Sequence, residues 1–393
     1  MKYRKIIHLD LDAFFCAVEE LNDPQLKGKA FAVGGNPEGR GVVSSCSYAA
    51  RSKGVHSAIP MVQAIKLCPE LIVVHGSYHK YTESSKAVME IINDLTPLVE
   101  QISIDEAFLD VSDLPQKTEV IARKLQSDIV EETRLPSSLG VASNKLVAKI
   151  ANDVGKKQHK GIDYPRAITI VEPGKEAEFL APLPVEMMWG VGAKTNKRLS
   201  ELGIRTIKDL AEMEVRDLQQ LFGKMGLFLS RHAKGLDDRP VESFHERKSI
   251  SQERTFMKDV GEKRIVESRI KELSEQVAFL LRQKGFFCST IRLKLRWSDF
   301  TTITRQISLK TPTDLESEIC KHAIELLENN WQVNRKVRLI GVGVSGLSQR
   351  VFQLSLWGGP DEKERKLTSA IDDLRNKYGK QIIYKGKTLK AKK

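Results

Sequence analysis

Three acidic residues stand inside segments that are otherwise apolar. Asp10 belongs to residues 6–12, where apolar and polar residues alternate as they do in a half-buried strand. Asp105 and Glu106 are neighbours in a second apolar segment. Neighbouring strand residues point to opposite faces, so both acids can serve one site only if the backbone bends there. Buried carboxylates are costly without compensating positive charge, and this requirement constrains any fold that the chain can adopt.

Oxygen ligation of a hard divalent cation is one way to compensate such carboxylates. Mg²⁺ prefers a few carboxylates together with substrate phosphates. Two such ions about 4 Å apart can activate an attacking oxygen and stabilise a leaving one. The alternative is a pair of solvated acids at the end of a strand, and an isolated Asp-Glu pair favours that interpretation.

A second group of residues suits phosphate oxygens. Tyr48 and Arg51 are three residues apart in a predicted short helix, so they share one face. An Arg fork beside a hydroxyl binds phosphate oxygens well, and Lys145, Lys149 and Lys156 follow a later strand and add positive charge. No G-x-x-x-x-G-K-[ST] motif occurs, which argues against a P-loop ATPase. Taken alone, Tyr48 and Arg51 are equally consistent with an ordinary surface pair.

The positive charge of the chain is clustered. The sequence carries 63 Lys and Arg against 51 Asp and Glu, a formal charge of +12. Residues 247–310 hold fifteen Lys and Arg against seven Asp and Glu, and the last nine residues add five lysines. Such clusters indicate a polyanionic partner, and nucleic acid is the first candidate. Because no apolar run approaches the ~20 residues of a membrane helix and the N-terminus has no signal-peptide core, we expect a cytoplasmic protein without membrane contact.

Two segments have the features of DNA contacts. Gly190 and Gly192 lie between helical segments with helix-hairpin-helix spacing. The tight hairpin points its backbone N–H groups and the N-terminus of the next helix, which carries Lys194, toward a DNA phosphate. In residues 291–297 apolar and basic residues alternate, so one strand face is basic. That basic face consists of Arg292, Lys294 and Arg296. A plain helical turn and a solvated strand face are the competing interpretations.

The order of strand and helix patterns divides the chain. Strands and helices mix over the first 165 residues, which predicts an α+β domain, and residues 173–235 are helical. Residues 237–247 are polar, charged and interrupted by proline, as in an interdomain linker. The order βαββαβ beyond them predicts a small sheet with helices on one face. A helical stretch is predicted at 362–378, and the sequence assigns no role to residues 358–393.

Five segments together resemble the Y-family of lesion-bypass DNA polymerases, especially the bacterial DNA polymerase IV type. They are residues 8–15, 47–55, 103–110 and 140–149 and the hairpin at Gly190, in the family's order and spacing. The resemblance covers about residues 5–357 and implies a multidomain α+β fold, a right-hand polymerase with palm, small fingers, helical thumb and βαββαβ little finger. The implied bounds are 1–11 and 76–166 for the palm, 12–75 for the fingers, 167–236 for the thumb, 237–247 for the linker, 248–348 for the little finger and 349–393 for the tail.

The resemblance also implies roles for individual residues. Asp10, Asp105 and Glu106, with the Leu11 carbonyl, would hold two Mg²⁺ ions, for which Mn²⁺ can substitute. Phe15 matches the steric gate beneath the sugar of the incoming nucleotide. The other residues implied at the nucleotide are Phe14, Ser45, Tyr48, Arg51 and Lys156. After Lys156 the family usually turns through Pro-x-Gly, whereas this chain continues Lys157-Gln-His-Lys-Gly-Ile162, so the triphosphate lysine is either Lys156 or Lys157.

A short motif near the end resembles the one by which bacterial polymerases bind the sliding clamp. It places a polar Gln before apolar anchors that can fill a pocket. Its members are Gln353, Leu354, Leu356 and Trp357.

The leading hypothesis is a low-fidelity, template-directed DNA polymerase, expected as a monomer, that inserts dNTPs on primer-template DNA during translesion synthesis. The primer 3′-OH would attack the dNTP α-phosphate with two Mg²⁺ ions and release pyrophosphate. The alternatives are a two-metal nuclease and a catalytically silent DNA-binding repair scaffold. Tyr48, Arg51 and Phe15 argue against the nuclease, which needs neither a triphosphate grip nor a sugar gate. The intact carboxylates argue against the scaffold.

Overall fold

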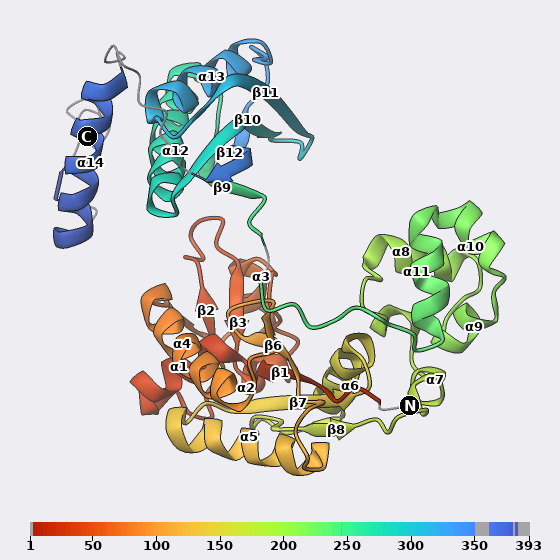
Figure 1. Ribbon diagram of the computed structural model, residues 1–393. Coiled ribbons are helices and arrows are strands. Elements are labelled where there is room, and N and C mark those ends of the chain that lie inside the picture. Colours follow the sequence, from red (N-terminus) through yellow and green to blue (C-terminus); the bar gives the residue numbers. More distant parts are fainter. Residues whose placement is uncertain (1–2, 245, 350–360, 380–381, 384–393) are drawn as a thin grey trace. The chain divides into compact units, whose positions relative to one another are not determined.

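The described part of the chain divides into two compact units in a computed structural model (Figure 1). The units are Met1–His245 and Glu246–Lys393, and the described residues are 3–244, 246–349, 361–379 and 382–383. The first unit contains a five-stranded and a three-stranded sheet, the second contains a four-stranded sheet, and each unit has its own apolar core. Within the described residues, no helix is both long enough and apolar enough to cross a membrane.

A five-stranded sheet forms the centre of the first unit, in the strand order β5-β6-β1-β7-β8. Its strands are β1 (Ile6–Leu11), β5 (Val99–Gln101), β6 (Glu106–Asp110), β7 (Ser137–Ala142) and β8 (Ile168–Ile170). Strand β1 runs antiparallel to both β6 and β7, and β8 runs parallel to β7. The first predicted strand is therefore the central one.

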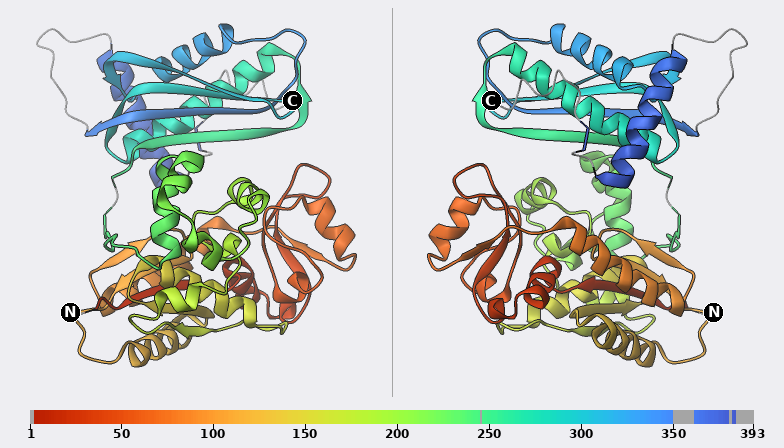
Figure 2. Two further views of the ribbon diagram at one scale, coloured as in Figure 1. Left: turned by 90° about the vertical axis from the view of Figure 1, so that its right-hand side faces the viewer. Right: turned by 90° about the vertical axis from the view of Figure 1, so that its left-hand side faces the viewer.

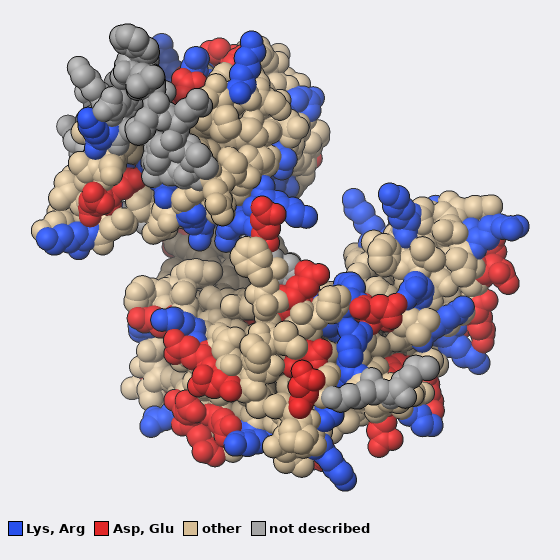
Figure 3. Space-filling view, viewed as in Figure 1, with Lys and Arg blue, Asp and Glu red and all other residues tan. Residues whose placement is uncertain are grey.

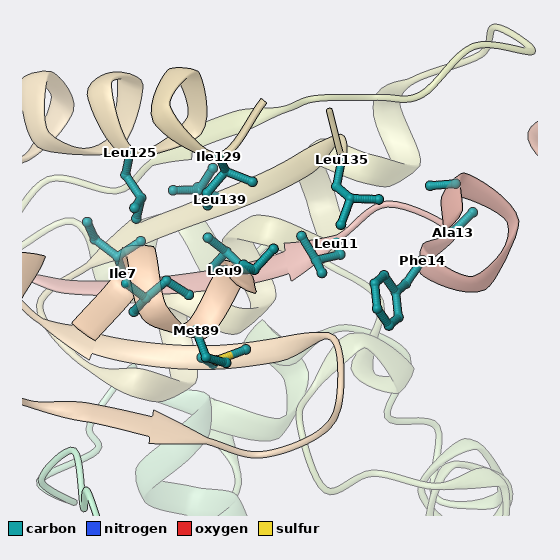
Figure 4. Packing of buried hydrophobic residues seen from close by; sticks show 14 of the residues in the cluster. Ile7, Leu9, Leu11, Ala13, Phe14, Met89, Leu125, Ile129, Leu135 and Leu139 are labelled. Carbon is teal, nitrogen blue, oxygen red and sulfur yellow. The ribbon is translucent and has the colours of Figure 1, made fainter. Parts of the chain in front are cut away.

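The alternation of faces predicted for residues 6–12 is confirmed, but the strand is buried on both faces rather than half-buried, because His8 and Asp12 on the polar face are also 0% exposed. Ile7, Leu9 and Leu11 pack on one face of the sheet, in a cluster with α4 (Tyr78–Leu95) and α5 (Thr118–Thr133) (Figure 4). The opposite face, with Ile6, packs against α6 (Lys145–Gln158). Because a one-residue slip would move the whole apolar set to the opposite face of the sheet, this packing fixes the face to which Asp10 belongs.

Helix α6 lies very close to β7 because Gly140 has no side chain. A Cβ at Gly140 would lie 1.9 Å from the Ala148 carbonyl oxygen and 2.5 Å from the Asn152 backbone nitrogen. The buried Asn152 side chain donates from Nδ2 to the carbonyls of His8 (3.2 Å) and Ser138 (2.9 Å). Glycine and amide thus hold α6 against both β1 and β7.

A small second sheet lies between β1 and α4 in the sequence. It contains β2 (Phe31–Gly34), β3 (Val43–Cys46) and β4 (Ile72–Val74) in the order β3-β2-β4. Its helical elements are α1 (Phe14–Asn22), η1 (Pro24–Leu26), α2 (Tyr48–Arg51) and α3 (Met61–Leu67). Helices α2 and α3 share a separate apolar cluster with this sheet, whereas α1 packs into the core of the large sheet.

Short helices follow β8, as predicted for residues 173–235. They are α7 (Glu176–Leu180), η2 (Val185–Met187), α8 (Ala193–Glu201), α9 (Ile207–Glu212), α10 (Val215–Phe222) and α11 (Lys224–Ala233). Their buried residues form one cluster with those of α6. The start of the predicted linker is also fixed to this unit, because Asp237 Oδ2 accepts a hydrogen bond from the Leu146 N–H (3.1 Å) and Arg239 covers the Trp189 ring at 4.6 Å.

The second unit has the predicted order βαββαβ. Its strands β9 (Ser249–Val260), β10 (Phe286–Trp297), β11 (Thr302–Thr313) and β12 (Val337–Gln349) form an antiparallel sheet in the order β11-β10-β12-β9. Helices α12 (Lys263–Gln283) and α13 (Glu316–Glu328) cover one face (Figure 2). The tail helix α14 (Asp361–Tyr378) is bound through two ion pairs, Arg282–Asp372 and Arg375–Glu275, both at 2.6 Å.

Candidate active site

The pairing of β1 with β6 brings the predicted carboxylates together. Asp10 lies directly opposite Glu106 in the register, and the Leu11 N–H donates to the Asp105 carbonyl at 3.0 Å. The backbone bends before β6, where the N–H groups of Ile102 and Ser103 both donate to the Glu106 carbonyl, at 3.1 and 3.3 Å. Such a bend is required if the adjacent Asp105 and Glu106 are to serve one site. Burial, together with the charges of Glu106 and Asp105, raises the pKa of Asp10.

Two lysines of α6 face these carboxylates. Lys156 Nζ lies 2.5 Å from Asp10 Oδ1 and 3.1 Å from Asp12 Oδ1, and Lys149 Nζ lies 3.0 Å from Glu106 Oε2. Lys156 occupies the site, whereas Lys157 is exposed. Burial raises the pKa of Asp10 to about 7 in spite of Lys156. Burial acts in the same direction on Glu106, but the hydrogen bond with His8 and the charge of Lys149 hold its pKa at about 2.

A buried histidine adjoins Glu106 on the same face. Asn152 Nδ2 lies 3.0 Å from His8 Nδ1. On the other side of the ring, His8 Nε2 lies 3.5 Å from Glu106 Oε2. Burial lowers the pKa of His8, which keeps the ring neutral and oriented toward the carboxylate.

The carboxylates of Asp10 and Glu106 are the type of donor that a hard divalent cation prefers, and they lie opposite each other in the register of β1 and β6. In the described residues no three His, Cys, Asp or Glu side chains are grouped closely enough to hold one ion. In this structure the positive charge beside the carboxylates comes from lysines, since Asp10 is paired with Lys156 and Glu106 with Lys149. The Leu11 side chain is in the core, so only its backbone is available as a ligand.

Phe15 lies on the first turn of α1, the helix that follows β1. The preceding Ala13 has left-handed backbone angles (φ 42°, ψ 48°), a costly conformation for a residue with a Cβ, and it marks the sharp turn between strand and helix. The Phe15 ring stacks on Tyr81 with centroids 4.1 Å apart at 12°, and the Tyr81 hydroxyl donates to Glu19 Oε1 at 2.5 Å. Phe14 is only 2% exposed, so its ring belongs to the core.

Tyr48 and Arg51 come from the single turn of α2. The Arg51 guanidinium lies 4.7 Å from the Tyr48 ring centroid, and Arg51 Nε donates to the Cys46 carbonyl at 3.2 Å. Burial and the charge of Asp12 raise the pKa of Tyr48 to about 12, so the phenol stays protonated and can donate. Ser45, at the end of β3, is buried beside Cys16.

Several residues of this site escaped the sequence analysis. Asp12 is completely buried and accepts from Ser138 Oγ at 2.8 Å, and the Ser103 hydroxyl accepts from the N–H groups of Asp105 (3.1 Å) and Glu106 (3.0 Å). The Asp-x-Asp spacing of residues 10–12 was a usable signal for Asp12, whereas Ser103 gave none. Conversely, Lys145 does not reach the site, because it is paired with Glu100 at 2.6 Å.

The two predicted DNA segments have the expected local geometry. Gly190 has a φ of 97°, which favours glycine, and Gly192 precedes α8 with the exposed Lys194 on its first turn. In β10 the apolar residues are buried against α12 and α13, so the basic residues take the open face. Lys294 is not free on that face, because its Nζ lies 2.8 Å from Glu253 Oε1. Residues 353–357, which carry the clamp motif, lie outside the described residues.

Known families cover most of the chain. Residues 9–153 match the impB/mucB/samB family, residues 247–356 match the C-terminal domain of that family, and residues 186–237 match the thumb domain of DNA polymerase-iota. DNA polymerase IV of Dehalococcoides mccartyi (strain CBDB1) is 38% identical over 396 residues, which cover 100% of this chain and 99% of that protein. DNA polymerase IV 1 of Bacillus subtilis (strain 168) is 37% identical and covers 99% of this chain and 94% of its own length.

Solved structures show the same relationship. A Y-family DNA polymerase chimera of Dbh and Dpo4 has a TM-score of 0.77 at 26% identity, over 87% of this chain and 99% of its own. A ternary complex of Dbh has a TM-score of 0.62 at 27% identity, over 87% of this chain and 98% of its own.

The chain belongs to the Y-family of DNA polymerases. Its fold is the right-hand polymerase fold with a helix-hairpin-helix thumb. It is a DNA-directed DNA polymerase of translesion synthesis, which binds DNA and deoxynucleoside triphosphates and depends on divalent metal ions. Family membership thus favours the polymerase hypothesis over the nuclease and the silent scaffold.

Proposed function

We propose that Asp10, Asp105 and Glu106, with the Leu11 carbonyl, hold two Mg²⁺ ions and that Mn²⁺ can substitute. The observation that supports this assignment is the register of β1 and β6, which sets Asp10 opposite Glu106 and bonds Leu11 to Asp105. When bound, two such ions activate the primer 3′-OH and stabilise the leaving pyrophosphate.

The protein's own residues then position the reactants. Lys149 and His8 restrain the Glu106 carboxylate in one orientation, and Ser103 holds the backbone bend that carries Asp105. Lys156, Tyr48 and Arg51 supply an ammonium, a hydroxyl and a guanidinium for the triphosphate. Phe15 supports the sugar face of the site, where its stack on Tyr81 keeps the ring from moving aside.

We assign domain bounds on the same grounds. Strands β1, β5, β6 and β7 of the large sheet, with helices α4, α5 and α6, form the palm (1–11 and 76–166), and the small sheet forms the fingers (12–75). Strand β8 and the helical region after it form the thumb (167–236). A linker (237–247) leads to the little finger (248–348), whose open sheet face with Arg292, Lys294 and Arg296 would follow the DNA backbone, as would the hairpin at Gly190, Gly192 and Lys194. In Figure 3, Lys and Arg side chains gather along one side of the second unit.

We further assign clamp binding to Gln353, Leu354, Leu356 and Trp357. The motif begins four residues after the end of β12, so it follows the folded sheet directly. A polar residue before apolar anchors suits a hydrophobic pocket on a partner.

Asp105 and Glu106 are needed for chemistry and not for holding DNA. We expect Asp105→Asn or Glu106→Ala to lower primer extension at least about a thousandfold, because a ligand of the metal ions is lost. Primer-template affinity, measured by fluorescence anisotropy, should change less than about threefold, since Lys and Arg contacts to phosphates supply most of the binding free energy. The exposed Asp94→Asn on α4 is the control, and substantial extension by Asp105→Asn would contradict the two-metal assignment.

Phe15 excludes the ribose 2′-OH by overlap and by offering no hydrogen-bond partner. Phe15→Val should remain folded and insert dCTP opposite template G, with selectivity for dCTP over rCTP reduced at least about tenfold. Single-nucleotide insertion kinetics measure this ratio, and circular dichroism checks the fold. If Phe15 is only a core aromatic, the variant loses stability and keeps its sugar selectivity.

The basic face of β10 governs affinity without sequence preference. Replacing Arg292, Lys294 and Arg296 together with Gln should reduce the slope of log affinity against log salt by up to about 3, near one for each phosphate that the variant no longer neutralises. Glu253→Gln should increase affinity, because it frees Lys294 from its ion pair. Lys321→Gln on α13, which packs on the other face of the sheet, is the matched control. An unchanged slope in the triple variant would remove this face from the duplex.

Clamp binding is tested by truncating the anchors. The triple variant Gln353→Ala, Leu356→Ala and Trp357→Ala should retain distributive synthesis and lose its stimulation by a bacterial sliding clamp. The reason is that the substitutions remove the pocket-filling groups and leave the palm untouched. Equal stimulation of the variant and the parent chain in a primer-extension assay would place the motif elsewhere.

A further inference from the structure

The segment that departs from the family pattern after Lys156 packs against Tyr48. The chain leaves α6 at Gln158 and returns to the sheet at β8, which begins with Ile168. The His159 ring lies 6.0 Å from the Tyr48 ring at 89°, and the Tyr164 ring lies 5.8 Å from it at 76°. Both contacts are edge-to-face, a favourable geometry for aromatic pairs. With Arg51 over the ring at 4.7 Å, three groups enclose Tyr48.

The return of this segment to the sheet is fixed by the buried Asp12. Asp12 Oδ2 accepts from the Arg166 N–H at 3.0 Å, and the Ala167 N–H donates to Ser138 Oγ at 3.0 Å. Gln126 Nε2 donates to the Arg166 carbonyl at 3.2 Å. Arg166 has a φ of 45°, the left-handed region that side chains disfavour, so these bonds hold the backbone in a conformation it would not adopt alone.

Asp12 is also bonded to Lys156, which we propose binds the triphosphate together with Tyr48 and Arg51. This ion pair links the segment to a second triphosphate-binding residue. Lys156 Nζ lies 3.1 Å from Asp12 Oδ1, while Asp12 Oδ2 holds Arg166. One buried carboxylate therefore fixes both the lysine and the backbone that carries Tyr164. Burial and the nearby charge of Glu20 raise the pKa of Tyr164, so its phenol stays neutral.

We propose that residues 159–167 are a support for the triphosphate grip, in which His159 and Tyr164 are positioning residues that orient the Tyr48 phenol for the incoming nucleotide. This inference rests on the proposed role of Tyr48, Arg51 and Lys156 at the triphosphate. Tyr48 belongs to a helix of one turn, which by itself leaves the side chain free to change rotamer. The enclosure orders the ring during folding, so nucleotide binding does not have to order it.

The support acts on nucleotide affinity and not on the chemical step. In the full-length chain, Tyr164→Leu should raise the KM for dNTP about five- to tenfold and change kcat less than about twofold. Inhibition by pyrophosphate should weaken by the same factor, because the leaving group contacts the same residues. Tyr164→Phe retains the ring and should restore the parent KM, while His159→Ala should raise KM in the same direction. Ile162→Ala, an exposed residue of the same segment, is the matched control.

A double-mutant cycle separates this inference from the proposed function. If Tyr164 acts through Tyr48, Tyr48→Ala raises KM and adding Tyr164→Leu raises it no further. If Tyr48→Ala leaves KM unchanged, the proposed triphosphate role of Tyr48 is wrong. If Tyr48→Ala raises KM while Tyr164→Leu and His159→Ala do not, the support is wrong and the triphosphate role stands. If Tyr164→Leu does not fold, the KM values of His159→Ala and of the control Ile162→Ala are compared instead. A KM for dNTP that is unchanged in His159→Ala would show that the support is wrong.

Discussion

Two lysines of α6 balance the carboxylates at the ends of β1 and β6, and the site depends on this balance. Lys156 is bonded to Asp10 and Lys149 to Glu106, at 2.5 and 3.0 Å. Without them, two acids in apolar strands would be buried without compensation, which is strongly destabilising. The lysines reach the strands only because α6 approaches β7 over Gly140, where any side chain would collide with the helix backbone.

Asp12 connects a proposed metal ligand, Asp10, to the residues proposed to bind the triphosphate. It shares Lys156 with Asp10, holds Ser138 on β7, and accepts the Arg166 N–H at the end of the segment that encloses Tyr48. The strained turn at Ala13 follows directly and turns the chain into α1, whose first turn carries Phe15. Asp10, Lys156 and the backbone of the segment that encloses Tyr48 are thus linked through one buried acid, so a change at Asp12 is expected to alter all three.

The sequence predicted most of the fold because strong patterns specify it. The alternation of residues 6–12 identified the central strand and its buried face, and the order βαββαβ identified the second sheet. The strands β3, β4 and β8, of three or four residues, were missed because so short a run carries no clear period. The carboxylates at 10, 105 and 106 stood out as acids in apolar segments. Asp12 and Tyr81 did not, because their importance arises from contacts between residues far apart in the chain. Ser103 did not either, because its role depends on the backbone bend before β6, which brings the N–H groups of Asp105 and Glu106 to its hydroxyl.

The central claim is that Lys156 neutralises Asp10 in the free protein and binds the triphosphate in the complex with DNA and nucleotide. A crystal structure of the full chain with primer-template DNA, Mg²⁺ and an unreactive dNTP analogue tests it directly. The account predicts that Lys156 Nζ leaves Asp10, stays bonded to Asp12 and lies within hydrogen-bond distance of a triphosphate oxygen. A structure in which Lys156 remains bonded to Asp10, with the triphosphate held without it, would contradict the account.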